Sequence, residues 1–367
     1  MRLSLSVAVL LMCLAQPALP QSTVENRPAV RLDGSAAQLK IELGGGSVSD
    51  FHLTDFPLNP LTWDSGRSTA GPRPMGHFLC LDRWGAPSEA EQRNGMPFHG
   101  EASRVQWRVV HKPEVKGEQV EAEMTAALPI AGLQIIRRIR LSKDAAAFSV
   151  TERVTNTNPL GRIYNMVQHP TIAPPFLDEH TLVDSNAKRG FMQSSPLPDP
   201  ENPSVEWPYA SDKGVQVDLR RLSAEPSPNV VSYTIEEEYG WTTASSVSRG
   251  LLIGYLWKVT DYPWFNAWRH SENGRPTARG LEFGTTGLHQ PFPVLVRKGS
   301  IFGRRIYEYL DANATEARSY ASFLFRIPAD YKGVAKITYR DGQLQLHEHG
   351  GRAGRVLTMK TGNLFPE

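Results

Sequence analysis

Two short segments, far apart in the chain, carry a histidine and a carboxylate of the types that suit proton transfer. The first, residues 156–170, ends just after His169, and the second, residues 280–283, contains Glu282. Both segments read as strands, so a fold that brings them together would place the two side chains across a small ligand. An imidazole, with a reference pKa of about 6.5, and a carboxylate can then act as general acid and general base.

Motifs for other kinds of chemistry are absent from the sequence. It contains no phosphate-binding P-loop, no Gly-x-Gly-x-x-Gly turn after a strand, no Gly-x-Ser-x-Gly elbow and no His-Glu-x-x-His pair. Residues 347–349, with the sequence His-Glu-His, could bind a metal, but we interpret them as a polar, solvated strand end. We therefore expect no cofactor and assign no metal ligands, and whether the protein binds calcium is left open.

The body of the chain alternates apolar and polar residues with a period of two, which is typical of half-buried antiparallel strands. Residues 251–256 are more continuously apolar, as in a strand buried on both faces. Helical periodicity is nearly absent, although we predict a short helix over residues 315–322. The alternating segments are residues 105–110, 133–141, 148–154 and 334–339, and turn signals occur at residues 142–144, 156–159, 272–274 and 340–342. The pattern predicts one all-β domain of two large packed sheets.

The composition fits a single large domain and gives no sign of a nucleic-acid or anionic-membrane partner. The 367 residues include 28 prolines and 30 glycines that are spread throughout, with no linker between halves. The formal net charge of +2 and the interspersed charges predict no nucleic-acid partner. The body has no apolar stretch long enough to span a membrane. The oligomeric state is left open.

The N-terminus has the pattern of a secretory signal peptide over residues 1–21. Arg2 precedes an apolar run that is too short to span a bilayer, and a region of small and polar residues follows. We therefore expect an exported protein, periplasmic or extracellular, with an N-terminal extension at residues 22–34 and one domain at residues 35–367. Loss of Cys13 with the peptide would leave Cys80, in an apolar run, as a buried lone cysteine without an intramolecular disulfide.

Three stretches concentrate histidine, arginine, glycine and tryptophan, at residues 73–102, 155–176 and 262–285. In this order and spacing they resemble the galactose mutarotase-like superfamily, which includes aldose 1-epimerases and hexose-6-phosphate mutarotases. The resemblance rests on a Thr-Asn turn followed by a His-Pro pair, a His-Gly loop and a Leu-Glu strand end, and covers roughly residues 35 to 345. It implies a β-supersandwich fold, in agreement with the strand pattern.

The resemblance also implies a chemistry, the opening and closing of a sugar ring. Mutarotation removes the proton of the anomeric hydroxyl, protonates the ring oxygen, and reverses both steps after rotation of the open carbonyl end. By position, Glu282 resembles the base and His169 the acid, and His99 would hydrogen-bond the sugar. Arg83 and Arg73 both fall near the family position of a hydroxyl-binding arginine. Further candidates for contact with the substrate are Trp264, Trp268 and Gln168.

Two departures from the family pattern leave the identity of the sugar open. Residues 171–173 lack the usual aromatic and asparagine residues after the His-Pro pair, and residues 101–102 lack the form expected for a sugar phosphate. The glutamate and two histidines favour an aldose 1-epimerase-like enzyme that acts on a free sugar or short oligosaccharide. Fold does not fix function, so a non-catalytic carbohydrate-binding protein remains open. A polysaccharide lyase or hydrolase also remains open, although no carboxylate pair at glycosidase spacing stands out.

Overall fold

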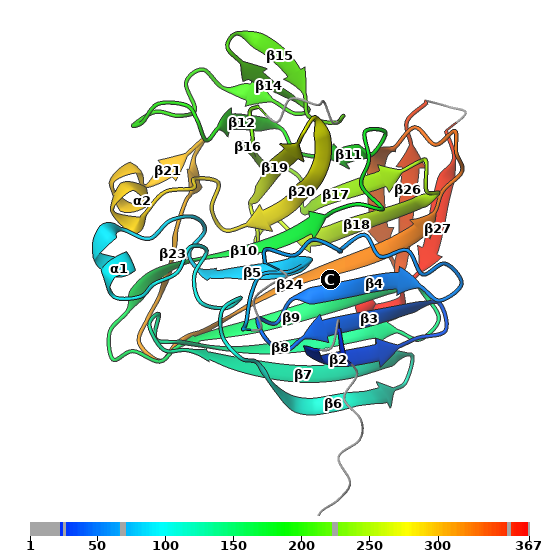
Figure 1. Ribbon diagram of the computed structural model, residues 1–367, viewed down its shortest axis with the longest axis horizontal. Helices are drawn as coiled ribbons and strands as arrows, with labels where there is room; N and C mark the ends of the chain where they lie inside the picture. Colours follow the sequence, from blue (N-terminus) through cyan, green and yellow to red (C-terminus); the bar gives the residue numbers. More distant parts are fainter. Residues whose placement is uncertain (1–22, 25–26, 67–70, 222–226, 351–353, 366–367) are drawn as a thin grey trace, which may run out of the picture.

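Two large antiparallel sheets, packed face to face, make up most of the protein (Figure 1). The computed structural model describes residues 23–24, 27–66, 71–221, 227–350 and 354–365. The expected all-β class and the supersandwich of two large sheets are confirmed. The expected signal peptide, with Cys13, lies outside the described residues. No helix in the described ranges has the length and apolar character needed to cross a membrane.

The described elements alternate long strands with short connections. The strands are Thr23–Val24 (β1), Arg27–Asp33 (β2), Ala37–Glu42 (β3), Val48–Leu53 (β4), His77–Asp82 (β5), Arg108–Lys116 (β6), Gln119–Leu128 (β7), Leu133–Ser142 (β8), Ala147–Asn156 (β9), Arg162–Ile172 (β10), Leu182–Ser185 (β11), Arg189–Met192 (β12), Val205–Glu206 (β13), Tyr209–Asp212 (β14), Val215–Asp218 (β15), Val230–Thr234 (β16), Tyr239–Ser246 (β17), Leu251–Lys258 (β18), Trp264–Glu272 (β19), Arg275–Gly284 (β20), Ser300–Ile301 (β21), Arg304–Arg305 (β22), Glu308–Leu310 (β23), Thr315–Arg326 (β24), Val334–Arg340 (β25), Gln343–Glu348 (β26) and Val356–Lys360 (β27). The helices are Glu89–Arg93 (α1), Phe292–Lys298 (α2) and the 3-10 turn Gly362–Leu364 (η2).

The larger sheet has twelve strands, and strands from distant parts of the chain meet at its centre. Its order is β1-β2-β3-β4-β5-β10-β20-β19-β16-β12-β13, and β23 pairs with β10 outside this path. The second sheet has eight strands in the order β11-β17-β18-β24-β9-β8-β7-β6. Strand β10 therefore lies between β5 and β20, which places the two segments singled out by their chemistry side by side.

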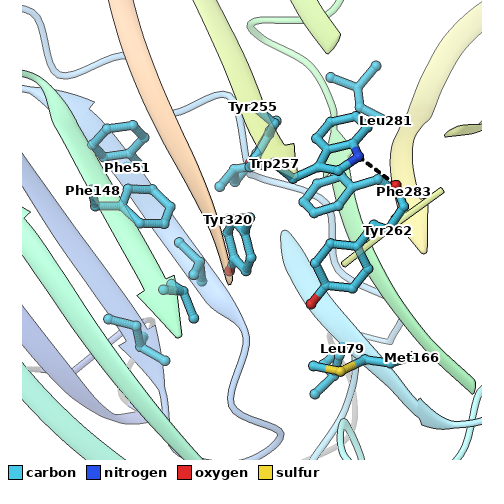
Figure 2. Close-up of a cluster of buried hydrophobic side chains, with 14 of the residues drawn as sticks. Phe51, Leu79, Phe148, Met166, Tyr255, Trp257, Tyr262, Leu281, Phe283 and Tyr320 are labelled. Atoms are coloured by element: carbon cyan, nitrogen blue, oxygen red, sulfur yellow. Dashed lines mark hydrogen bonds between the residues drawn. The ribbon is translucent and has the colours of Figure 1, made fainter. Parts of the chain in front are cut away.

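Aromatic side chains fill the space between the two large sheets (Figure 2). Phe283 of β20 stacks on Trp257 of β18 with ring centroids 4.2 Å apart, and Phe51 of β4 meets Phe148 of β9 edge to face at 4.8 Å. The indole N–H of Trp257 donates to the carbonyl of Tyr262 at 2.8 Å (Figure 2). Truncation of such a buried aromatic side chain typically costs about 3–5 kcal/mol. This core therefore holds the backbones of β10 and β20 rigidly from one side.

The C-terminal strands β25, β26 and β27 form a three-stranded sheet that covers part of the outer face of the eight-stranded sheet. A second apolar cluster lies beneath it and includes Trp241, Phe323 and Leu344. A groove of about 1760 Å³ runs between this sheet and the turns at the end of the sandwich. Neither His169 nor Glu282 lines the groove.

The strand pattern was largely predictable, with one clear error. Strands β8, β9, β18 and β25 occupy the segments expected to be strands, and of residues 105–110 only those from Arg108 onward are in a strand, β6. Residues 315–322 are not a helix but part of β24, because this segment pairs with β9 on one side and β18 on the other. A long-range ladder of this kind overrides a weak local preference. The expected extension at residues 22–34 contributes β2, which pairs with β3 in the larger sheet.

Candidate functional site

The register of three neighbouring strands brings His169 and Glu282 into direct contact. Gln168 pairs with Phe283 across β10 and β20, which sets His169 opposite Glu282. Successive side chains of a strand point to opposite faces, so Gln168 and Phe283 face the core while the next residues face outward. The distance from His169 Nε2 to Glu282 Oε1 is 3.1 Å. Both side chains are almost fully buried.

Hydrogen bonds to the outer atoms of this pair define where its protons lie. The hydroxyl of Thr171 donates to the carbonyl of His169 at 3.3 Å and accepts from His169 Nδ1–H at 2.9 Å. The Nε2 lone pair then faces Glu282. The indole N–H of Trp84 donates to the other Glu282 oxygen, Oε2, at 2.7 Å. Thr171, one of the departures from the family pattern, thus orients the histidine ring.

Burial sets the charge of the pair. It raises the pKa of the Glu282 carboxyl well above its ordinary value, although the Trp84 bond acts in the opposite direction. It also lowers the pKa of His169 to about 3. Because the Nε2 lone pair faces Oε1, the raised pKa of Glu282 and the lowered pKa of His169 favour the shared proton on the carboxyl group, which donates from Oε1 to the neutral ring. The two groups share one proton, and moving it from Glu282 to His169 gives a carboxylate base and an imidazolium acid.

His99 and His289 stand beside the pair on two separate loops. The ring of His99 lies 5.5 Å from the rings of both His169 and His289, measured between centroids. The backbone of His99 is left-handed, with φ of 66°, an uncommon conformation for a residue with a side chain. It is held by two bonds, since the Gly85 N–H donates to His99 Nδ1 at 3.1 Å and the His99 N–H donates to the Gly85 carbonyl at 3.0 Å. His99 Nε2 therefore carries the proton and is a donor.

All three histidines are neutral at neutral pH. Burial is the largest cause of the lowered pKa of His99, and the proximity of His169, His289 and Arg104, which disfavours a further positive charge, acts in the same direction. Burial also lowers the pKa of His289 to about 4. Arg104 is exposed at the edge of this group. The group can thus offer neutral donors and acceptors to hydroxyl groups.

Aromatic rings form a wall next to the histidines. Phe78 of β5 stacks on the His169 ring with centroids 4.2 Å apart, and Trp268 of β19 meets the same ring at 5.8 Å. Trp63 joins the wall at 5.7 Å from Phe78 and 6.0 Å from Trp268. Trp63 and Trp268 are half-buried, and Phe98, 48% exposed, lies beside His99. Such faces suit the C–H surface of a sugar ring.

A glycine leaves room for the Glu282 carboxylate. Gly280 lies on the same face of β20, and a Cβ there would approach Glu282 Oε1 to 2.8 Å and the Cβ of Trp268 to 3.1 Å. A side chain at this position would therefore displace the carboxylate or the wall. The glycine is explained by this close approach rather than by its backbone angles.

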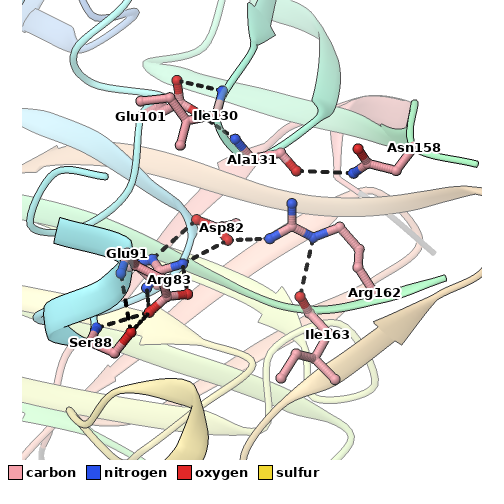
Figure 3. Close-up of polar contacts among 10 residues, drawn as sticks. All are labelled: Asp82, Arg83, Ser88, Glu91, Glu101, Ile130, Ala131, Asn158, Arg162 and Ile163. Atoms are coloured by element: carbon pink, nitrogen blue, oxygen red, sulfur yellow. Dashed lines mark hydrogen bonds and ion pairs between the residues drawn. The ribbon is translucent and has the colours of Figure 1, made fainter. Parts of the chain in front are cut away.

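The two arginines from the sequence prediction are engaged in ion pairs. Arg83 pairs with Asp82 at 3.2 Å and with Glu91 at 2.8 Å, and Arg162 pairs with the same Asp82 (Figure 3). Arg73 binds both oxygens of the Asp64 carboxylate at 2.7 and 2.6 Å. Both guanidinium groups are therefore occupied by ion pairs with neighbouring carboxylates. The other family departure, Glu101, accepts from the backbone N–H groups of residues 130 and 131 (Figure 3).

Two further residues from the prediction lie away from the pair. Gln168 is fully buried between the sheets, where its amide donates to Glu152 at 2.6 Å and its carbonyl meets His77 at 3.1 Å. Trp264 is also fully buried and donates to the carbonyl of Arg305 at 3.2 Å. Neither side chain reaches the face that carries His169. The structure thus brings together Glu282, His169, His99 and Trp268, and leaves the other predicted side chains in supporting positions.

Residues that the sequence reasoning missed complete the site. They are Trp84, Thr171, His289, Trp63, Phe78 and Phe98. Most of them lie in loops whose packing no periodicity reveals. Phe78 and Thr171 were within reach of the sequence, because antiparallel pairing of the two stretches at residues 73–102 and 155–176 would have placed Phe78 opposite His169.

The candidate metal ligands at the C-terminus are used otherwise. Glu348 is buried, accepts from the Lys332 N–H at 2.9 Å and pairs with Arg355 at 3.3 Å. Within the described ranges no group of three or more histidine, cysteine, aspartate or glutamate side chains is arranged to hold a metal ion. Cys80 is free and fully buried, as expected for a small apolar residue.

Solved structures establish the fold class. A galactose mutarotase-like protein from Clostridium acetobutylicum superimposes with a TM-score of 0.61 and 13% identity over 84% of this chain and 98% of its own. A galactose mutarotase related enzyme from Lactobacillus acidophilus gives 0.58 and 10% over 82% and 98%. A protein from Synechocystis sp. PCC 6803 gives 0.58 and 12% over 85% and 99%. The chain therefore has the galactose mutarotase-like fold.

Sequence comparison adds no closer relative. No family model matches the chain, and no curated protein matches it significantly. At 10–13% identity the structural similarity defines the scaffold alone, and the function has to be argued from the site.

Proposed function

We propose that the protein is an exported, cofactor-independent isomerase of the aldose 1-epimerase type, which interconverts the anomers of a sugar by opening and closing its ring. One observation carries the proposal, the contact of 3.1 Å between His169 Nε2 and Glu282 Oε1 beside a wall of aromatic rings. The mutarotase-like fold of the chain supports it.

The sugar reacts between the two groups. The sugar lies with its C–H face on Trp268 and Trp63. As it enters between His169 and Glu282, the shared proton passes to His169. Hydroxyl groups of the sugar then donate to Glu282 and stabilise it as a carboxylate. Glu282 takes the proton of the anomeric hydroxyl, and His169 protonates the ring oxygen, so the ring bond breaks. Rotation of the carbonyl end and reversal of both transfers give the other anomer. His99 Nε2–H donates to a sugar oxygen throughout.

The charges around the site favour a neutral sugar. Arg73 and Arg83 are tied to carboxylates, and the three histidines are neutral at neutral pH. A phosphate or carboxylate group would find Arg104 at the edge, but no buried cation among the described residues that contact the pair. The proposed substrate is therefore a free aldose or the reducing end of a short oligosaccharide. The signal-like N-terminus supports the same choice, because sugar phosphates are cytoplasmic.

A carbohydrate-binding protein without catalysis is the second candidate. The half-buried rings of Trp63 and Trp268 favour it, since stacking alone can hold a sugar. A polysaccharide hydrolase has less support, because the groups bonded to Glu282 are an imidazole and an indole rather than a second carboxylate.

The test is anomer interconversion by the protein across a panel of aldoses and uronic acids, followed by polarimetry or saturation-exchange NMR. We expect acceleration for neutral sugars and a loss of at least ~100-fold in Glu282→Gln and in His169→Asn. Glu272→Gln, at an exposed turn, is the matched control and should keep full activity. Folded variants of the pair that keep full activity would refute the assignment. Tight sugar binding without exchange would identify a binding protein.

Export is tested separately. We expect the protein expressed with its native N-terminus in a Gram-negative host to appear in the periplasm with about 15–21 residues removed, as N-terminal sequencing would show. A full-length chain in the cytoplasm would contradict this.

A further inference from the structure

Arg279 is the least satisfied charged side chain in the described part of the protein. It lies on β20, is 0% exposed, and its Nε, Nη1 and Nη2 atoms have no hydrogen-bond partner. Arg279 lies on the same face of β20 as Leu281 and Phe283, because side chains alternate along a strand. It therefore faces the space between the two large sheets, away from the Glu282 site. Buried polar groups in proteins are nearly always bonded, so a buried guanidinium group with three unbonded nitrogens is suited to hold a water molecule or an anion.

A second arginine lies directly opposite. Arg269 of β19 pairs in register with Arg279 and is 1% exposed. Arg269 donates to the carbonyl of Ser227 at 2.8 Å and to that of Pro228 at 3.1 Å. Like charges directly opposite on neighbouring strands destabilise a sheet. Arg279 therefore lies opposite a second positive charge, and this makes its own unbonded charge more unfavourable.

The nearest described carboxylates bond elsewhere. Asp184 pairs with Arg220 and His349 and accepts from the Val334 N–H at 2.8 Å. Asp218 accepts from the N–H of Arg220 at 2.9 Å. Both act on Arg279 only at longer range. On the neighbouring strand β16, the hydroxyl of Tyr233 donates to the Tyr209 carbonyl at 2.8 Å.

Arg279 keeps its positive charge at neutral pH. Burial, followed by the charge of Arg269, lowers the pKa of Arg279 to about 9. This value is still well above neutral pH, so the side chain remains a cation in the folded protein. An isolated buried cation is strongly unfavourable unless an opposite charge compensates it.

We propose that Arg279, with Arg269, binds a small inorganic anion in the interior of the sandwich, of the size and charge of chloride. Both guanidinium groups are almost completely buried, which favours a small monoatomic ion over a larger sulfate, phosphate or sugar carboxylate. A monoatomic halide accepts from several N–H groups at once and needs about the space of one water molecule. The site is separate from the proposed sugar site and does not depend on its function.

Bound halide stabilises the folded state, because the unfolded chain has no such site. Urea unfolding is measured on halide-free protein in sodium chloride, sodium bromide and sodium gluconate at equal ionic strength, with no guanidinium chloride present. At a halide concentration ~100 times the dissociation constant, the unfolding equilibrium constant should fall about 100-fold relative to gluconate. Arg279→Met should abolish the difference, whereas Arg108→Met, at an exposed position on β6, should preserve it.

Crystals of the unaltered protein grown with bromide give a direct answer even if Arg279→Met does not fold. We expect an anomalous bromine peak within hydrogen-bonding distance of the Arg279 nitrogens. Equal unfolding in halide and gluconate, or density for water alone at this place, would overturn the proposal. A halide effect that survives in a folded Arg279→Met variant would also overturn it.

Discussion

The indole of Trp84 is expected to stabilise the ionised form of Glu282 that the proposed reaction requires. It donates to Glu282 Oε2 at 2.7 Å and, after burial, is the interaction that acts on the pKa of this carboxyl. Trp84→Phe keeps an aromatic ring in place and removes only the donor. The carboxylate form of Glu282 then loses its bond to the indole, while the carboxylic acid form loses much less.

The magnitude follows from the strength of a bond to a charged group. Such hydrogen bonds contribute about 1.5–3 kcal/mol, and about 1.4 kcal/mol corresponds to one pKa unit. Trp84→Phe should therefore disfavour the ionised form of Glu282, and with it the transfer of the shared proton to His169, by about 1.5–3 kcal/mol. Because the reactive form carries the same number of protons as the resting pair, the rate should fall about 10- to 100-fold across the neutral part of the pH profile. The alkaline limb of kcat/KM, where the pair loses its one proton, should move to higher pH, because the pKa of Glu282 rises.

The assay is saturation-exchange NMR of the preferred sugar between about pH 4 and 9. Trp264→Phe is the matched control, because it also removes one buried indole donor, the bond to the Arg305 carbonyl, but does so away from the site. It should lose similar stability and keep the pH profile of the parent protein. An unchanged rate and an unshifted alkaline limb in Trp84→Phe, with the variant folded, would refute the view that Glu282 must ionise for the reaction.

Three further changes probe the surroundings of the pair. Gly280→Ala should lower kcat/KM roughly 100-fold with circular dichroism unchanged, because its Cβ would come within 2.8 Å of the Glu282 carboxylate; full activity would contradict the close packing. Trp268→Ala should raise KM more than it lowers kcat, since it removes the stacking face and leaves the proton-transfer groups, and initial rates over a sugar titration would test this. Arg83 lowers the pKa of Glu91 to about 2, so this bond stabilises the fold above about pH 4.5, and the gain is lost as the pH falls toward 2. Glu91→Gln should flatten that part of the dependence of the urea midpoint on pH, and an unchanged slope would argue against the bond.

The fold was predictable because its signal is repeated along the chain. Alternation with a period of two recurs from β8 to β25, so one misread segment, β24, did not change the class. That segment was mistaken for a helix because its strand character comes from partners far away in sequence, β9 and β18. A local sequence pattern does not reveal that β24 pairs with β9, because the partner strand lies roughly 160 residues earlier in the chain.

The contact between His169 and Glu282 was predictable for a different reason, since the resemblance had singled out both residues before any contact was known. The binding residues were not, because the type of a side chain does not reveal its partners. Arg83 and Arg73 have the chemistry to hold a sugar, but both are engaged in ion pairs. Arg83 pairs with Glu91 and Asp82, and Arg73 pairs with Asp64. A loop carboxylate that comes within ion-pairing distance only after folding leaves no trace in the spacing of the arginines.

The alternation of side chains along β10 places His169 and Gln168 on opposite faces of the strand. His169 and Gln168 are adjacent, both polar and both buried, yet one faces the aromatic wall and the other faces the core. On the core side, Gln168 bonds to Glu152, which in turn pairs with Arg137 at 2.6 Å, so a polar network braces β10 from behind. The strand thus holds His169 on one face, while hydrogen bonds on the other face fix its backbone. This arrangement gives a physical reason for a glutamine next to the proposed acid that involves no contact with the sugar.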